Sequence, residues 1–305
     1  MKKNESSVTS LVSAFGRAYH SKYDTPKIFD DFIAEDLITQ KEFADIRENM
    51  IKGIQFFNHD IADKFQDQPD EILKWITQVQ LSPTPLARAA YCEKVLFHEI
   101  LLGTNQYVIL GAGLDTFCFR HPELNDRLEI FEVDYPTTQD FKKNRLANAN
   151  YHIPDHLHFV SMDFTKESTV QKLVEEGFMP NKKTFFSLLG VTYYLTKEEI
   201  ANLINNLFAE IPTGSSIVFD YADEKLFEER GISNRVQNIV HMASTSGEPM
   251  KSCFTYDEME KMLENAGLLI YEHLSPDAIN NQFFRDRADY LSAFETIHYI
   301  HAVKK

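Results

Sequence analysis

Cysteine is scarce in this chain of 305 residues, and no long hydrophobic run is present. The three cysteines, Cys92, Cys118 and Cys253, are scattered, so the sequence predicts neither a disulfide framework nor a zinc site and indicates a reducing compartment. No stretch approaches the roughly 18 apolar residues of a membrane-spanning helix, and the polar segment that begins at Met1 lacks the apolar core of a signal peptide. We therefore expect a cytoplasmic protein without a membrane partner.

Basic residues are outnumbered, with 31 lysines and arginines against 46 aspartates and glutamates, which gives a net charge of −15. Such a surface repels phosphate backbones, and no basic stripe with interleaved aromatic residues is present. Nucleic acid is therefore not expected as a partner, and a small molecule is. Hydrophobic residues make up 43% of the chain, which is enough for one large domain with a substantial core.

Motifs for metal binding and for nucleophilic catalysis are also missing. His152, His156 and His158 lie close together but lack the further Cys or acidic partner that zinc needs. His298 and His301 are an odd number of residues apart on a predicted strand, so they point to opposite faces. No Gly-x-Ser-x-Gly elbow and no Walker loop occurs. We expect no metal.

The central motif of the chain is Tyr107-Val-Ile-Leu-Gly-Ala-Gly-Leu-Asp-Thr116. Its first four residues are typical of a buried strand. Gly111 and Gly113 follow at once, and a strand that ends in Gly-x-Gly makes a tight turn whose bare backbone a ligand can approach. Because many structural turns also contain Gly-x-Gly, the motif is a weak signal by itself.

A second predicted strand, Leu128 to Val133, ends in Asp134, which is placed to hydrogen-bond ribose hydroxyls. Dinucleotides and S-adenosylmethionine are both bound in this way. The dinucleotide fingerprint wants a third glycine where Thr116 stands, and a long helix at the pyrophosphate, whereas Pro122 interrupts the segment after the turn. The residues therefore favour an adenosyl ligand without a pyrophosphate, and an NAD(P)-dependent oxidoreductase is the first alternative.

Three motifs occur together: Leu110 to Thr116, Phe131-Glu-Val-Asp-Tyr-Pro136 with Lys142 and Arg145 behind it, and Ser187-Leu-Leu-Gly-Val-Thr-Tyr-Tyr-Leu-Thr196. With them the chain resembles the leucine carboxyl methyltransferase superfamily of class I S-adenosylmethionine-dependent enzymes. The third motif is most similar to the bacterial polyketide O-methyltransferases of tetracenomycin type. The resemblance extends from about Ser7 to the C-terminus. It implies an α/β, Rossmann-like class I methyltransferase fold with a seven-stranded, mostly parallel sheet, an antiparallel last strand and an N-terminal helical cap.

The sequence pattern agrees with that architecture. Residues 1–84 read as helical, with helices at Val8–Tyr19, near Lys41–Phe57 and at Glu71–Gln80, and form the predicted cap. Residues 85–305 form the cofactor-binding domain, in which residues of about 222–256 are interpreted as a lid. Further predicted helices start at Pro85, with Thr84 as the N-cap, and after Thr196, which makes a capping box with Glu199. The predicted strands are Tyr107–Leu110, Leu128–Val133, Leu157–Val160, Phe185–Leu189, Ser216–Phe219, Leu268–His273 and Phe294–Val303.

The resemblance also implies roles for individual residues. Arg88 would pair with the carboxylate of the cofactor, because a guanidinium fork suits a carboxylate. Asp163 would accept a hydrogen bond from adenine, and Phe164 would supply an apolar wall. The predicted cofactor-binding set is Arg88, Gly111, Ala112, Gly113, Asp115, Asp134, Asp163, Phe164, Leu188 and Leu189. Many relatives have a glutamate at the position of Leu189, so a protein that binds the cofactor without turnover is the second alternative.

The acceptor pocket is expected between the cap, the turn at residues 190–194 and the lid. Tyr193, Tyr194 and His20 are the predicted catalytic residues, and Arg17, Tyr19 and His241 are the predicted substrate-binding residues. Arg17 and His20 share a helix face at i, i+3 spacing, and this positive face suggests an acidic or phenolate-like acceptor.

The predicted activity is S-adenosylmethionine-dependent methyl transfer to an oxygen of a small, polyketide-like molecule, by a homodimer. A carboxylate is already anionic at pH 7 and needs no base, whereas a phenol or alcohol benefits from one. The sequence leaves both open.

Overall fold

Seven strands form one sheet in the structure, a computed structural model that describes residues 8–163, 166 and 169–305. The order across the sheet is β3-β2-β1-β4-β5-β7-β6. The first five strands pair in parallel, and β7 is antiparallel to both β5 and β6. This confirms the predicted sheet. The strands are β1 (Gln106–Leu110), β2 (Glu129–Asp134), β3 (Leu157–Ser161), β4 (Thr184–Leu188), β5 (Ser216–Ala222), β6 (Leu268–Leu274) and β7 (Ile297–Lys304).

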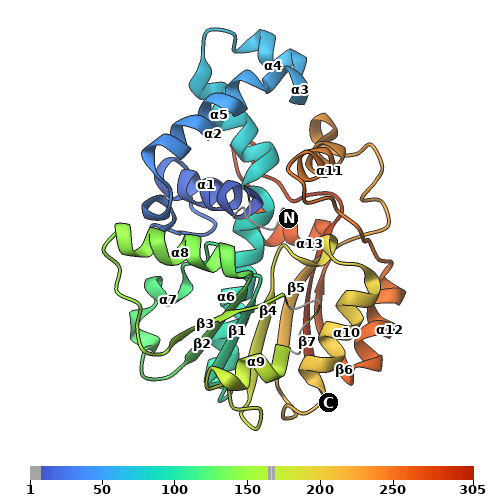
Figure 1. The fold of residues 1–305 in the computed structure, drawn as a ribbon. Coiled ribbons are helices and arrows are strands. Elements are labelled where there is room, and N and C mark those ends of the chain that lie inside the picture. The colour runs from blue at the N-terminus through green and yellow to red at the C-terminus, as the bar shows by residue number, and fades with distance from the viewer. Residues whose placement is uncertain (1–7, 164–165, 167–168) are drawn as a thin grey trace.

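Helices cover both faces of the sheet (Figure 1). On one face pack α6 (Pro83–Leu101) and α7 (Phe117–Arg120), and on the other pack α9 (Thr169–Glu175), α10 (Lys197–Phe208) and α12 (Tyr256–Asn265). Every residue of β1, β4 and β5 is buried, as expected of strands covered on both sides. The remaining elements of this part are η3 (Pro122–Leu124), α8 (Pro136–Asn148), η4 (Thr192–Tyr194), η5 (Ile232–Asn234), α11 (Arg235–Thr245), α13 (Pro276–Ile279) and η6 (Asn280–Phe284).

The N-terminal helices lie together above the end of the sheet, with α11 beside them (Figure 1). They are α1 (Val8–Tyr23), η1 (Ala34–Leu37), α2 (Gln40–Lys52), α3 (Ile54–Phe57), α4 (His59–Lys64), α5 (Pro69–Ile76) and η2 (Thr77–Leu81). Their shared core includes Phe15, Leu37 and Trp75, and it also takes in Leu114 and Leu146 from the other part of the chain. The helices therefore pack onto the sheet domain through a continuous apolar contact.

Local sequence signals explain several helix boundaries. The predicted capping box of Thr196 and Glu199 is present at α10. The helix predicted to start at Pro85 begins earlier, at Pro83, because proline needs no hydrogen-bond acceptor in a first turn. Ser82 precedes it, but its hydroxyl donates to the carbonyl of Gly16 (3.1 Å) and does not cap the helix. The structure thus corrects the predicted N-cap at Thr84.

Two of the predicted cap helices are divided. The segment predicted near Lys41–Phe57 is split into α2 and α3 at Gly53, where a glycine weakens the helix. The segment predicted at Glu71–Gln80 is α5 followed by the π-helical turn η2. In the part of the chain that the structure describes, no helix combines the length and apolarity needed to cross a membrane.

Candidate functional site

A cavity of about 890 Å³ lies at the carboxyl ends of β1 and β4, between the sheet and the cap. Its floor is the glycine turn after β1 together with Asp134 and the turn after β4. Its walls come from α1, α2, α3, α6 and α11. Pockets for one small ligand measure roughly 300–1,000 Å³, so the volume of this cavity lies near the upper end of that range.

The glycine turn presents bare backbone to the cavity. Gly111 has a φ of 73° and lies so close to the turn after β4 that a Cβ there would come within 2.6 Å of Val191 Cγ2. A side chain at Gly111 would clash with Val191, so the close approach of these two turns and the positive φ both require glycine. Ala112, Gly113 and Asp115 also line the cavity, and the cradle fits an adenosyl group.

Asp134 ends β2 and fastens the glycine turn. Its Oδ2 accepts a hydrogen bond from the Gly113 amide (2.7 Å), and its Oδ1 accepts one from the Tyr135 amide (2.7 Å). Burial raises the pKa of Asp134, while these amide hydrogen bonds oppose the rise. A carboxylate offers about four acceptor sites, so Asp134 can hold the turn and still accept hydrogen bonds from a ligand in the cavity that it lines.

Arg88 reaches the cavity from α6 and is held by two partners. Its Nη1 donates to the Tyr193 hydroxyl (2.9 Å) and to Asp220 Oδ2 (3.1 Å). The Tyr193 hydroxyl in turn donates to Asp220 Oδ2 (3.2 Å). Burial, and then the charge of Asp220, raises the pKa of Tyr193 well above its usual value. Tyr193 lines the cavity and belongs to the arginine cluster, and the catalytic role predicted for it stays a prediction.

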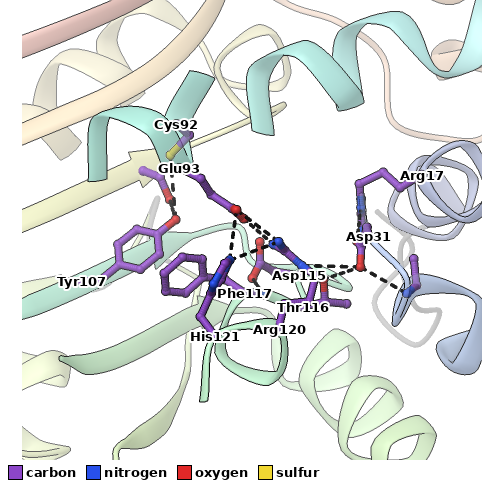
Figure 2. A network of polar contacts seen from close by, with 12 residues as sticks. Arg17, Asp31, Cys92, Glu93, Tyr107, Asp115, Thr116, Phe117, Arg120 and His121 are labelled. Carbon is purple, nitrogen blue, oxygen red and sulfur yellow. Dashed lines mark hydrogen bonds and ion pairs between the residues drawn. The ribbon is translucent and has the colours of Figure 1, made fainter. Parts of the chain in front are cut away.

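A second polar network joins the cap to the glycine turn (Figure 2). Asp31 is almost fully buried and accepts hydrogen bonds from Arg17 Nε (2.7 Å) and Thr116 Oγ1 (2.6 Å). Arg17 Nη2 also donates to the carbonyl of Leu114 (2.7 Å). Although burial acts against ionisation, the guanidinium groups of Arg17 and Arg120 hold the pKa of Asp31 below its usual value. The positive charge of Arg17 is thus balanced, and the predicted cationic face is wrong.

His20 and Tyr19 lie away from the cavity. His20 is completely buried inside the cap, where its Nε2 accepts a hydrogen bond from the Ile28 amide (2.8 Å) and its Nδ1 lies 2.7 Å from Asp24 Oδ2. Both ring nitrogens are therefore occupied. Tyr19 packs in the cap core against Phe15. The structure corrects both predictions: neither residue lines the cavity.

Two predicted cofactor residues are also displaced from the cavity. Leu188 is fully buried in the core on the α10 side of the sheet, because neighbouring residues of a strand face opposite sides; its partner in the sequence, Leu189, lines the cavity. Asp163 is not among the lining residues, and its Oδ2 pairs with Lys166 Nζ (2.7 Å), which does line the cavity. Phe164 lies outside the described residues.

The upper part of the cavity, which we call the acceptor half, is mainly apolar. Tyr194, predicted as catalytic, and His241, predicted as substrate-binding, both line the cavity. The ring of His241 contacts that of Phe56 (5.4 Å between centroids). The other apolar side chains there come from the cap, α11 and the segments near it: Val12, Phe29, Met50, Leu226, Ile239, Met242, Met250, Phe294 and Ile297.

Sequence reasoning assigned no role to Asp31 or Asp220, although both organise the site. Asp220 follows the predicted strand Ser216–Phe219 and belongs to none of the three motifs, and Asp31 lies in a loop without a motif. A third buried group, the ion pair between Glu132 of β2 and Lys142 of α8, stands behind the glycine turn. Within the described ranges, no group of His, Cys, Asp and Glu side chains is arranged to hold a metal ion.

Comparison with known proteins gives a consistent result. A family model described as leucine carboxyl methyltransferase matches residues 10–208. A protein of Bacillus subtilis (strain 168) named "Putative S-adenosyl-L-methionine-dependent methyltransferase YktD" is 69% identical over 305 residues, which is 100% of both chains. A similarly named protein of Saccharopolyspora erythraea is 33% identical over 44% of this chain and 46% of its own. The crystal structure of a DUF574 family protein from Streptomyces avermitilis covers 99% of both chains with a TM-score of 0.58 at 12% identity, which shows a shared fold.

Proposed function

The chain belongs to the leucine carboxyl methyltransferase family and is an S-adenosylmethionine-dependent methyltransferase, and from this premise we propose that it methylates an oxygen of a small, largely apolar molecule. The family assignment removes the alternative of an NAD(P)-dependent oxidoreductase. The acceptor oxygen belongs to a carboxylate or a hydroxyl, as in a polyketide-like metabolite. Neither a nucleic acid nor a membrane is part of the proposal, and a homodimer remains a prediction that light scattering can test.

The composition of the acceptor half carries this proposal. Its lining is mainly apolar, and the two cap-side arginines of the cavity, Arg17 and Arg120, are already paired with Asp31 and Glu93. A carboxylic acid, with a pKa of about 4, reaches such a pocket already as an anion. An amine, with a pKa of about 10, would first have to lose a proton to a base. The proposal therefore favours oxygen over nitrogen.

The cofactor supplies an electrophilic methyl group on a sulfonium. This chain's residues bind and orient: the proposed roles are Arg88 at the cofactor carboxylate, Asp134 at the ribose and the glycine turn at the adenosyl group. Tyr194 and His241 are proposed to contact the acceptor, because both line the half above the turn that follows β4. Apolar walls exclude water, and alignment of the acceptor with the methyl group supplies most of the acceleration.

A methyl-transfer assay with isotopically labelled cofactor tests the proposal. The panel contains aromatic carboxylic acids, phenols and amines that match each other in carbon skeleton. A product whose label is released by mild base is a methyl ester, and a product that keeps it is an ether when the acceptor is a phenol and an N-methyl amine when the acceptor is an amine. Preferential labelling of an amine would overturn the proposal. Saturable cofactor binding without turnover on any acceptor would instead support a binding protein.

A further inference from the structure

Asp220 connects three elements at the floor of the cavity. It lies on β5, and its side chain is fully buried. Its Oδ1 accepts a hydrogen bond from the Gly190 amide (2.6 Å), and its carbonyl oxygen accepts one from the Thr192 hydroxyl (2.6 Å). These contacts tie the end of β5 to the turn that follows β4.

The second carboxylate oxygen of Asp220 faces the arginine. Asp220 Oδ2 accepts from Arg88 Nη1 (3.1 Å) and from the Tyr193 hydroxyl (3.2 Å), while Arg88 Nη1 also donates to the Tyr193 oxygen (2.9 Å). Among the described residues, the hydrogen bonds of Arg88 all start from Nη1. A guanidinium has five N–H donors, so Nε and Nη2 keep theirs for a ligand in the cavity that Arg88 lines.

The turn after β4 fixes the guanidinium from the other side. A Cβ on Gly190 would lie 2.4 Å from both Nη1 and Nη2 of Arg88, so the guanidinium rests directly on the backbone of this turn. Asp220 holds that turn through the Gly190 amide and holds Arg88 through Oδ2. One carboxylate therefore sets both the position of the guanidinium and the surface on which it rests.

We propose that Asp220 is a positioning residue that presets Arg88 to receive the carboxylate of the cofactor. A buried guanidinium needs a paired anion, and an arginine that is already ordered loses less conformational freedom when the ligand binds. Asp220 supplies both conditions before binding. The inference rests on the proposed role of Arg88 and is independent of the acceptor.

The Asp220→Asn variant separates the two functions of the carboxylate. The asparagine oxygen can still accept from the Gly190 amide, whereas its NH2 group meets the Arg88 and Tyr193 donors and cannot accept from them. The turn after β4 keeps the hydrogen bond from the Gly190 amide, and Arg88 loses its carboxylate partner. Asp223→Asn is the matched control: Asp223 follows β5, accepts from the Lys225 amide (3.0 Å), and does not line the cavity.

Calorimetry with two ligands measures the effect of each variant on binding of the cofactor carboxylate. S-adenosylhomocysteine carries the amino-acid carboxylate, and 5′-methylthioadenosine lacks it. In Asp220→Asn, affinity for S-adenosylhomocysteine should fall about 10-fold or more, because the Arg88 guanidinium is no longer ordered to hydrogen-bond the carboxylate of the ligand. Affinity for 5′-methylthioadenosine should stay within about 2-fold. Asp223→Asn should leave both unchanged. Equal losses for the two ligands would show a merely structural role and overturn the inference, as would the absence of any loss.

Two further variants keep the inference distinct from the role of Arg88. If Arg88→Ala binds S-adenosylhomocysteine like the wild type, the role proposed for Arg88 is wrong. If Arg88→Ala binds weakly and adding Asp220→Asn changes nothing more, Asp220 acts through Arg88; a further loss in the double variant contradicts this. If Asp220→Asn does not unfold cooperatively, Tyr193→Phe replaces it. This variant should also lose affinity for S-adenosylhomocysteine but not for 5′-methylthioadenosine, by a smaller factor. Equal losses for the two ligands would count against the inference.

Discussion

Replacing Gly190 by alanine is expected to destabilise the protein more than the same replacement at Gly267, although the two glycines have nearly identical backbone conformations. Their φ values are 73° and 74°, so each substitution carries a left-handed strain of about 1–2 kcal/mol. At Gly267 nothing lies within 4 Å of the added Cβ. At Gly190 the Cβ would lie 2.4 Å from two nitrogens of Arg88, so the guanidinium must move.

That movement lengthens the hydrogen bonds from Arg88 to Asp220 and Tyr193. A hydrogen bond between charged groups contributes about 1.5–3 kcal/mol, and we expect this to be the difference in unfolding free energy between Gly190→Ala and Gly267→Ala. Urea unfolding of both variants, with equal slopes, measures it.

Calorimetry with S-adenosylhomocysteine adds a second test of the same geometry. Gly190→Ala should bind this ligand about 10-fold more weakly, and Gly267→Ala should bind it normally. If both variants have the same unfolding midpoint and the same affinity, the guanidinium does not rest on Gly190 in the way described.

Three further predictions concern other contacts of the structure. Asp134→Ala should weaken cofactor binding by about 1.5–3 kcal/mol through lost hydrogen bonds to a charged acceptor, and calorimetry that finds unchanged affinity would refute the ribose assignment. Arg17→Ala leaves Asp31 buried without its nearest cation, so unfolding free energy should drop by about 3 kcal/mol; a drop below about 1 kcal/mol in urea titrations would contradict the buried pair. Burial, and then the neighbouring His298, lowers the pKa of His273 from 6.5 to about 4. Because the unfolded chain then takes up this proton first, stability should fall as the pH drops from 6.5 through 4, and the fall should be smaller in His273→Gln; equal falls in both proteins would contradict this.

The strands and the glycine turn could be predicted because their signals are local. An apolar run followed by Gly111 and Gly113, or ended by Asp134, needs no knowledge of distant residues to be recognised. The capping box at Thr196 is equally local. These features placed the glycine turn and Asp134 together at the carboxyl edge of the sheet, where both line the cavity; that they bind the cofactor stays a prediction.

The errors concern side chains whose partners no sequence motif identifies. Helical spacing put Arg17 and His20 on one face, but it could not reveal that Asp31 and Asp24 occupy them. Asp220 and Arg88 are 132 residues apart in the sequence, and no motif in either segment predicts the hydrogen bond between them. Leu188 was misplaced for a simpler reason: it was assigned to the site together with its neighbour Leu189, although successive residues of a strand face opposite sides of the sheet.

The position of β7 in the sheet has a consequence for synthesis on the ribosome. β7 lies between β5 and β6 and is the only strand in the described chain that pairs with β6. While residues 268–274 have emerged and residues 297–304 have not, β6 has no neighbour and β5 has an open edge, and both can pair wrongly with another chain. The last strand is therefore the step that closes the sheet, and a chain truncated before residue 297 should aggregate or recruit a chaperone.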